Sequence, residues 1–289
     1  MIKSTIKKAL TAVALAAGAV GSANAFIISA GDLKITIDGY DIANVGYAAV
    51  PGLKCQNSTA NCDAASLGAA GMGSFDTMGI VSVASITNMA GDVTYFSRIN
   101  DGYLTGVFGG LLDRSVETTC GILGCTTSIL SEGGYFNLYK NTAQYDASLG
   151  PTGAGVNLLA GIYPGITDGA LYLSGVFVSG ALFGDTDTTY INSYNNSTLA
   201  GGGQGFLNVT GGSAAGLFDT NSLTDLNGQQ RDLFMDATYN DANGAASGLG
   251  WTVALTASIK GAAVPEPGAL ALIALGMIGA GAATARRKA

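Results

Sequence analysis

The chain has no histidine among its 289 residues. The absence excludes Ser-His-Asp and Cys-His catalytic groupings, and with them zinc, haem or iron sites that need an imidazole ligand. Tryptophan occurs once and proline five times. With so little proline, few positions prevent an extended segment from pairing in a sheet.

Basic residues are scarce away from the two ends of the chain. Residues 26–263 hold seven lysines and arginines against nineteen acidic side chains, which is a net charge of −12. A surface of this sign repels nucleic acid and anionic membranes, and no basic stripe offers a binding face for either. Nucleic-acid binding is therefore excluded. The other six basic residues are Lys3, Lys7, Lys8, Arg286, Arg287 and Lys288.

The first 25 residues have the pattern of a secretory signal peptide. Three lysines precede an apolar stretch over Ala9–Val20, and Ala23-Asn24-Ala25 forms an A-x-A cleavage site before Phe26. The apolar stretch is too short and too rich in alanine for a membrane span. We expect a signal peptidase to remove residues 1–25, which leaves residues 26–263 as the folded body.

The last 26 residues, 264–289, combine three features in a fixed order. Pro265-Glu266-Pro267 is followed by seventeen uncharged residues, Ala269–Ala285, and then by the basic stop Arg286-Arg287-Lys288. A helix over the uncharged run would be about 25 Å long, a little less than the hydrocarbon core of a bilayer. The basic residues would hold the C-terminus in the cytoplasm. A plain membrane anchor is the alternative interpretation of this tail.

The order and spacing of these features resemble the PEP-CTERM family of exported bacterial proteins. The resemblance implies that an exosortase, a membrane protease–transpeptidase, recognises Pro265, Glu266 and Pro267. It also implies export through the inner membrane of a Gram-negative bacterium, with residues 269–285 as a transient anchor. The cell surface or the extracellular matrix would be the final location.

The four cysteines suit an oxidising compartment. Cys55 and Cys62 flank one short loop, and Cys120 and Cys125 flank another. Two local disulfides are the simplest of the three possible connectivities. Zinc is the alternative, but the spacings are not those of paired C-x₂-C ligands.

The body reads as strands separated by turns. Leu33–Asp38 alternates apolar and polar residues, and Trp251–Lys260 repeats the same period over ten residues. The pattern predicts one all-β domain, a β-sandwich or jelly roll of about eight to twelve strands. The polar stretch Asp185–Gly216 is predicted as a long loop, with Gly201–Gly203 as a hinge. The shorter candidate strands are 80–86, 93–96, 103–108, 135–139, 170–178, 205–209 and 231–239.

The acidic residues offer little for catalysis. Most aspartates stand beside glycine or asparagine in turn-like contexts, and Glu117 and Glu132 form the one pair of glutamates in the body. We therefore expect no enzyme activity and no cofactor. Weak calcium binding is the alternative, because oxygen ligands gather within nine residues. These calcium candidates are Asp219, Asn221, Asp225 and Asn227.

Two classes of function remain open. A second stretch, Gly205–Gly212 followed by Phe218–Asn221, resembles a block in flocculation- or exopolysaccharide-associated PEP-CTERM proteins. The resemblance implies a non-enzymatic surface or matrix protein with extracellular polysaccharide as its partner, associated with biofilm or flocculation. The alternative is a secreted carbohydrate-binding module, or a carboxylate-dependent glycan-active enzyme, that uses exposed aromatics. The aromatic candidates for it are Tyr190, Tyr194 and Trp251, of which Trp251 is expected in the core.

Overall fold

The structure is a computed structural model that describes residues 32–43, 77–122, 124–195, 197–198 and 200–262. The predicted signal peptide with Ala23 and Ala25, the pair Cys55 and Cys62, and the sorting tail lie outside the described residues. No helix within the described ranges is long and apolar enough to cross a membrane. The expected span at 269–285 stays a prediction.

The body is all-β, as the alternating patterns predict. The described residues form twelve strands and a few single-turn helices. The strands are β1 (Asp32–Ala43), β2 (Thr77–Asn88), β3 (Thr94–Ser97), β4 (Tyr103–Gly121), β5 (Gly124–Asn141), β6 (Ala170–Val178), β7 (Tyr190–Asn195), β8 (Gly201–Gly211), β9 (Leu223–Thr224), β10 (Gln230–Arg231), β11 (Leu233–Asp241) and β12 (Val253–Ala262). The helices are α3 (Arg98–Asp101), η1 (Leu158–Ala160), α4 (Ala215–Phe218) and α5 (Ala245–Gly248).

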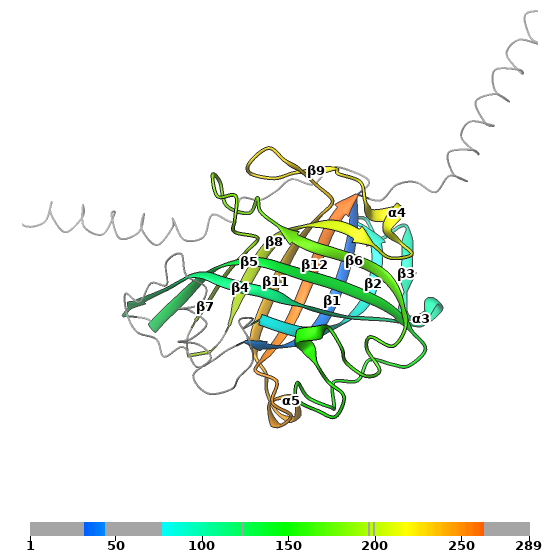
Figure 1. Cartoon of the computed structure of the whole chain (residues 1–289), viewed down its shortest axis with the longest axis horizontal. Helices are drawn as coiled ribbons and strands as arrows, with labels where there is room; N and C mark the ends of the chain where they lie inside the picture. The colour runs from blue at the N-terminus through cyan, green and yellow to red at the C-terminus, as the bar shows by residue number, and fades with distance from the viewer. Residues whose placement is uncertain (1–31, 44–76, 123, 196, 199, 263–289) are drawn as a thin grey trace, which may run out of the picture.

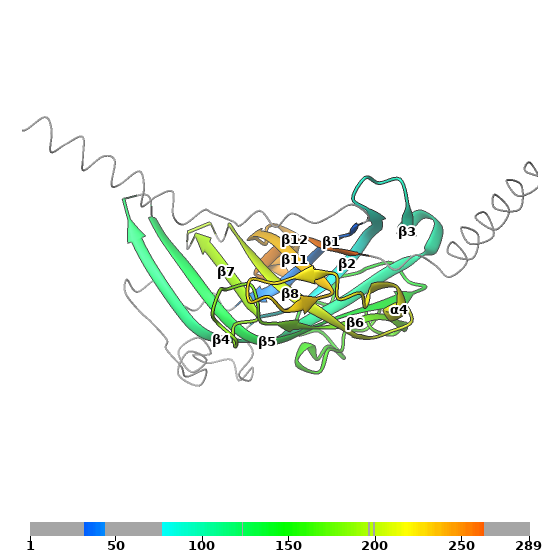
Figure 2. The same ribbon diagram turned by 90° about the horizontal axis from the view of Figure 1, so that it is seen from above.

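The strands close into a barrel with eight positions around its wall (Figure 1). All pairings in the wall are antiparallel, and β1 pairs with β2 on one side and with β12 on the other. Strands β6 and β7 share one position, because both pair with β5 and with β8 at different heights. The β4–β5 hairpin extends past the barrel to one side (Figure 2).

The closed barrel replaces the expected sandwich or jelly roll. Strand patterns report which face of each strand is buried but not which strands are neighbours. Here the first and last strands of the body pair over ten residues, from Asp32 with Ala262 to Asp41 with Val253. This long-range pairing joins the two ends of one sheet, so the inner faces of its own strands pack against one another.

Most of the interior of the barrel is an apolar core. Alternate residues of β1 face it, and Leu33, Ile35 and Ile37 are almost completely buried. Phe96 of β3 and Phe218 of α4 close one end, and both pack against Tyr172. Burial of this alternating set is the main stabilising contribution to the wall.

A second apolar cluster lies on the outside of the wall. Trp251 is 1% exposed there and packs with Tyr163, Leu158 and Ile80. The connection between β5 and β6, residues 142–169, supplies Leu158 and Tyr163 and covers the outer side of β1, β2 and β4. The expected core position of Trp251 is confirmed.

Most predicted strands are present, but the predicted loop over Asp185–Gly216 is wrong. It contains all of β7 and β8, and Gly201–Gly203 begins β8 rather than forming a hinge. Glycine is required at 203 because a β-carbon there would collide with the hydroxyl of Tyr190, and at 201 because it would meet the Ser193 carbonyl. The glycines that obscured the strand in the sequence are needed for its close packing.

Candidate functional site: a groove on the outer face of the barrel

A groove with a volume of about 320 Å³ lies on the outer face of the barrel. Its floor is formed by β1, β2 and β12, where Asp38 pairs in register with Thr256 on one side and with Ser82 on the other. Its sides come from α3, the start of β4 and the β5–β6 connection. The lining side chains are Asp38, Tyr40, Ser82, Arg98, Tyr103, Gln144, Tyr145, Ala254, Leu255 and Thr256.

The aromatic side of the groove is rigidly supported from below. The ring of Tyr40 stacks on Trp251 with centroids 6.0 Å apart, and Trp251 packs in turn against Tyr163 at 6.2 Å. The indole Nε1 of Trp251 donates a hydrogen bond to the Ala147 carbonyl at 3.1 Å. Tyr40 therefore presents a fixed ring, which costs little conformational entropy when a ligand binds.

Polar groups surround the aromatic side. Asp38 and Gln144 are exposed. Arg98 donates from Nη2 to the Ser82 hydroxyl at 2.8 Å and to the Val83 carbonyl at 3.3 Å, so its guanidinium is held in place. The Tyr145 hydroxyl is buried without a hydrogen-bond partner among the described residues, and burial raises its pKa far above the ordinary value. Tyr145 is therefore a neutral donor at any physiological pH.

This combination suits a polar ring-shaped ligand better than a chemical reaction. A sugar can place its C–H face on an aromatic ring while its hydroxyls bond to carboxylate, amide and guanidinium groups. Glycoside hydrolysis needs two carboxyl groups. Asp38 is the one carboxylate that the described residues contribute to the groove.

The two glutamates singled out in the sequence are not brought together. Glu117 pairs in register with Ser128 and Glu132 with Leu112, so four ladder positions of β5 separate the two sites. At ~3.3 Å per residue the separation is ~13 Å. Glycosidases hold their carboxyl groups about 5–9.5 Å apart, so this pair does not have a hydrolytic geometry.

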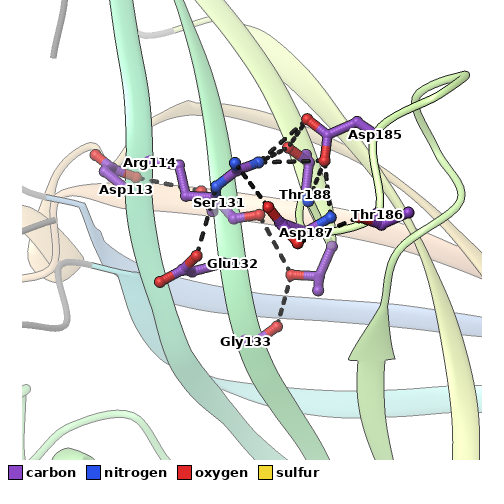
Figure 3. Close-up of polar contacts among 10 residues, drawn as sticks. Asp113, Arg114, Ser131, Glu132, Gly133, Asp185, Thr186, Asp187 and Thr188 are labelled. Carbon is purple, nitrogen blue, oxygen red and sulfur yellow. Dashed lines mark hydrogen bonds and ion pairs between the residues drawn. The ribbon is translucent and has the colours of Figure 1, made fainter. Parts of the chain in front are cut away.

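Glu132 belongs instead to a cluster around Arg114 that fastens the β6–β7 connection to the wall (Figure 3). Arg114 stands where the β4–β5 register shifts. Its guanidinium contacts the carboxylates of Asp185 and Asp187 at 3.1 Å each and that of Glu132 at 3.5 Å, and it donates to the Thr188 hydroxyl at 2.9 Å. This cluster holds β7 in line with β6.

The Asp185 carboxylate is the best satisfied acid of this cluster. Burial by itself raises its pKa, but hydrogen bonds from the backbone N–H groups of Thr188 and Asp187, from the Thr188 hydroxyl, and the charge of Arg114 outweigh burial. Together they lower the pKa to about 2. Asp185 therefore stays ionised at any physiological pH and acts as a structural anchor.

The four calcium candidates are engaged in other contacts. Asp225 accepts from Arg231 Nε at 2.8 Å and from the backbone N–H groups of Asn227 and Gln229, both at 2.8 Å. Asn227 accepts from the Gly184 N–H at 2.7 Å. Asp219 accepts from the amide of Asn221 at 3.4 Å. No group of three Cys, Asp or Glu side chains that could hold a metal ion occurs in the described ranges.

The two tyrosines proposed for the carbohydrate alternative are not on the outer surface of the barrel. Tyr190 is 6% exposed, and Tyr190 and Tyr194 both line the inside of the barrel. The aromatics on the outer groove are Tyr40, Tyr103 and Tyr145. The alternating pattern of strand β1 could have indicated that Tyr40 faces outward. The other two aromatics of the groove, Tyr103 and Tyr145, lie more than 40 residues away in the sequence, so the pattern around Tyr40 does not point to them.

The predicted bridge between Cys120 and Cys125 is confirmed. The two residues are a cross-strand pair at the end of the β4–β5 hairpin. A pairing of Cys55 with Cys62 stays a prediction.

We expect alkylation of the exported protein without reductant to label neither Cys120 nor Cys125, and both to be labelled after reduction. Replacing both by serine is expected to lower the free energy of unfolding by about 2 kcal/mol, because the bridge closes a short loop. Peptide mapping by mass spectrometry and urea unfolding measure the two effects. A labelled thiol at either position before reduction would contradict the assignment.

Comparison with known proteins identifies the tail alone. Residues 263–288 match the family described as the PEP-CTERM protein-sorting motif. The match supports an exosortase substrate, and it implies export across the inner membrane of a Gram-negative bacterium with a cell-surface or extracellular fate. No curated protein and no solved structure matches the chain.

Proposed function

We propose that this protein is a non-enzymatic component of the cell surface or extracellular matrix that binds extracellular polysaccharide through the outer groove. A signal peptidase removes residues 1–25, and an exosortase then processes the tail at Pro265–Pro267. The barrel is delivered outside the cell, where it associates with the polysaccharide of a biofilm or floc. The sorting motif at residues 263–288 is the observation that carries this proposal.

The body supports a binding role rather than catalysis. The groove joins a supported tyrosine ring to exposed carboxylate and amide groups, which is the chemistry that a neutral or weakly basic glycan requires. It offers a single described carboxylate, and Glu117 and Glu132 stand too far apart to act together. The chain has no histidine to serve as a general base near neutral pH.

The proposal is tested with the exported protein and the polysaccharide isolated from the cells that make it. We expect the double variant Asp38→Ala/Gln144→Ala to lose about tenfold in affinity, because two hydrogen-bonding groups are removed from the groove. Co-sedimentation of protein with polysaccharide gives the affinity. Both side chains are exposed, so the fold is expected to be unchanged by circular dichroism.

The matched control is Asp92→Ala/Gln229→Ala, which removes the same two residue types from exposed positions away from the groove. We expect it to bind like the unchanged protein. Equal binding by the groove variant and the control would refute the groove as the polysaccharide site. Release of sugar from the polysaccharide, abolished by one acidic substitution, would favour the enzyme alternative.

A further inference from the structure

The sequence contains two Asn-Gly pairs, Asn227-Gly228 and Asn243-Gly244, and both lie within the described residues. Asparagine is a chemically labile side chain. It is most labile before glycine, because glycine has no side chain to shield its backbone nitrogen from the neighbouring amide carbon. A β-carbon on Gly228 or on Gly244 would meet no atom within 4 Å, so packing around the glycine protects neither pair.

The first pair is held in place by hydrogen bonds. The Oδ1 atom of Asn227 accepts from the Gly184 N–H at 2.7 Å, and its amide nitrogen donates to two carbonyls of the β6–β7 connection at 3.0 and 3.3 Å. The Gly228 N–H donates to the Asp225 carbonyl at 3.1 Å. These contacts must break before the amide carbon of Asn227 can approach the nitrogen of Gly228.

The second pair is open. Asn243 lies in the connection between β11 and α5, and its side chain is exposed. Within the described ranges, no hydrogen bond holds this side chain or the N–H of Gly244. The amide can therefore turn toward the Gly244 nitrogen without losing a contact.

We propose that Asn243 is a site of spontaneous deamidation in the exported protein. The Gly244 nitrogen attacks Cγ of Asn243 to form a cyclic imide, and the side-chain nitrogen leaves as ammonia with the proton of the Gly244 N–H. Water then opens the ring. Cleavage at Cγ gives aspartate, whereas cleavage at the main-chain carbonyl carbon gives isoaspartate, whose backbone contains an additional carbon atom.

The site lies between two points where the chain is fastened to the apolar cluster on the outside of the wall. On one side, Ala242 is 2% exposed and its N–H donates to the Thr252 carbonyl at 2.9 Å. On the other side, Ala246 packs on the cluster and its carbonyl accepts from the Trp251 N–H at 3.2 Å. A longer backbone between these points cannot keep both contacts unchanged. Isoaspartate therefore loosens the support of Trp251, whereas aspartate adds only a charge at an exposed position.

The test uses protein exported by cells that express the full chain, incubated at mildly alkaline pH for increasing times. Peptide mapping by mass spectrometry follows the exchange of an amide for a carboxylate at each asparagine. We expect Asn243 to react at least about tenfold faster than Asn227, whose hydrogen bonds must break first. In protein unfolded in urea we expect similar rates at the two sites, because the contacts that protect Asn227 are absent.

The matched control is Asn243→Gln, because a glutamine amide must form a larger ring and the exposed position tolerates the added methylene group. Asn243→Asp has the charge of one product and an ordinary backbone. We expect the deamidated fraction of the aged protein, isolated by anion exchange, to have an about tenfold lower folding equilibrium constant in urea unfolding. Aged Asn243→Gln and fresh Asn243→Asp are expected to unfold like the fresh unchanged protein.

The proposal is overturned if Asn243 keeps its amide, or if Asn227 reacts as fast as Asn243 in the folded protein. The role of the longer backbone is overturned if fresh Asn243→Asp is destabilised as much as the deamidated fraction, or if that fraction unfolds like the fresh protein. None of these outcomes depends on polysaccharide binding, which the variant Asp38→Ala/Gln144→Ala tests separately.

Discussion

Replacement of Pro265, Glu266 and Pro267 by alanine is expected to abolish processing and leave the uncut protein in the inner membrane. Because proline does not continue a helix, we expect the segment upstream of the apolar run to be extended and accessible to the exosortase. Alanine favours helix at all three positions and removes the one carboxylate of the motif. Cell fractionation and the mass of the mature protein measure the effect, which we expect to be nearly complete.

Two controls accompany this variant. Val264→Ala changes a flanking residue and is expected to be processed normally, and cells without an exosortase are expected to retain the unchanged protein as they retain the triple variant. Normal release of the triple variant would refute the sorting role of Pro265, Glu266 and Pro267, whereas retention of the uncut, unchanged protein would show that the tail is a plain membrane anchor. The match at residues 263–288 would then have no functional meaning.

Replacement of Trp251 by alanine is expected to lower the free energy of unfolding by about 3–5 kcal/mol. The indole is 1% exposed, packs against Tyr40 and Tyr163, and donates a hydrogen bond to Ala147. Its removal leaves a cavity between the wall and the β5–β6 connection, and it leaves the Ala147 carbonyl without its donor. Denaturant unfolding followed by circular dichroism gives the difference.

The matched control is Phe183→Ala, because Phe183 is also aromatic but is 81% exposed. We expect it to change the free energy of unfolding by less than about 0.5 kcal/mol. A similar small loss for Trp251→Ala would mean that the outer apolar cluster does not stabilise the barrel. Polysaccharide binding by Trp251→Ala is also expected to fall, because Tyr40 would lose its support.

The strands were largely predictable, and their neighbours were not. Leu33–Asp38 and Trp251–Lys260 alternate strictly because one face of each is buried, so the sequence predicts both as strands. Nothing in either segment indicates that they pair with each other over ten residues. Sequence patterns missed β7 and the first part of β8 for the same reason. The glycines of β8 are typical of a loop, and their role is visible only once Tyr190 and Tyr194 of β7 pack against them.

The candidate sites also divide into those that a local sequence pattern reveals and those that it does not. The tail could be found from the sequence because Pro265–Pro267, the apolar run and the basic stop are consecutive. The cross-strand pair Cys120 and Cys125 could be found because a hairpin brings close neighbours together. The outer groove could not be found, since Asp38, Arg98 and Gln144 come from segments that are distant in the chain.

By itself, the sequence determined export, the all-β class and the absence of imidazole chemistry, because each depends on residue type or on local order. Only the tertiary structure decided that the sheet closes, that Trp251 supports Tyr40 from below, and that Asp185 and Asp187 neutralise Arg114. These features depend on contacts between residues far apart in the chain. Such contacts form only when the chain folds, so no local pattern in the sequence reveals them.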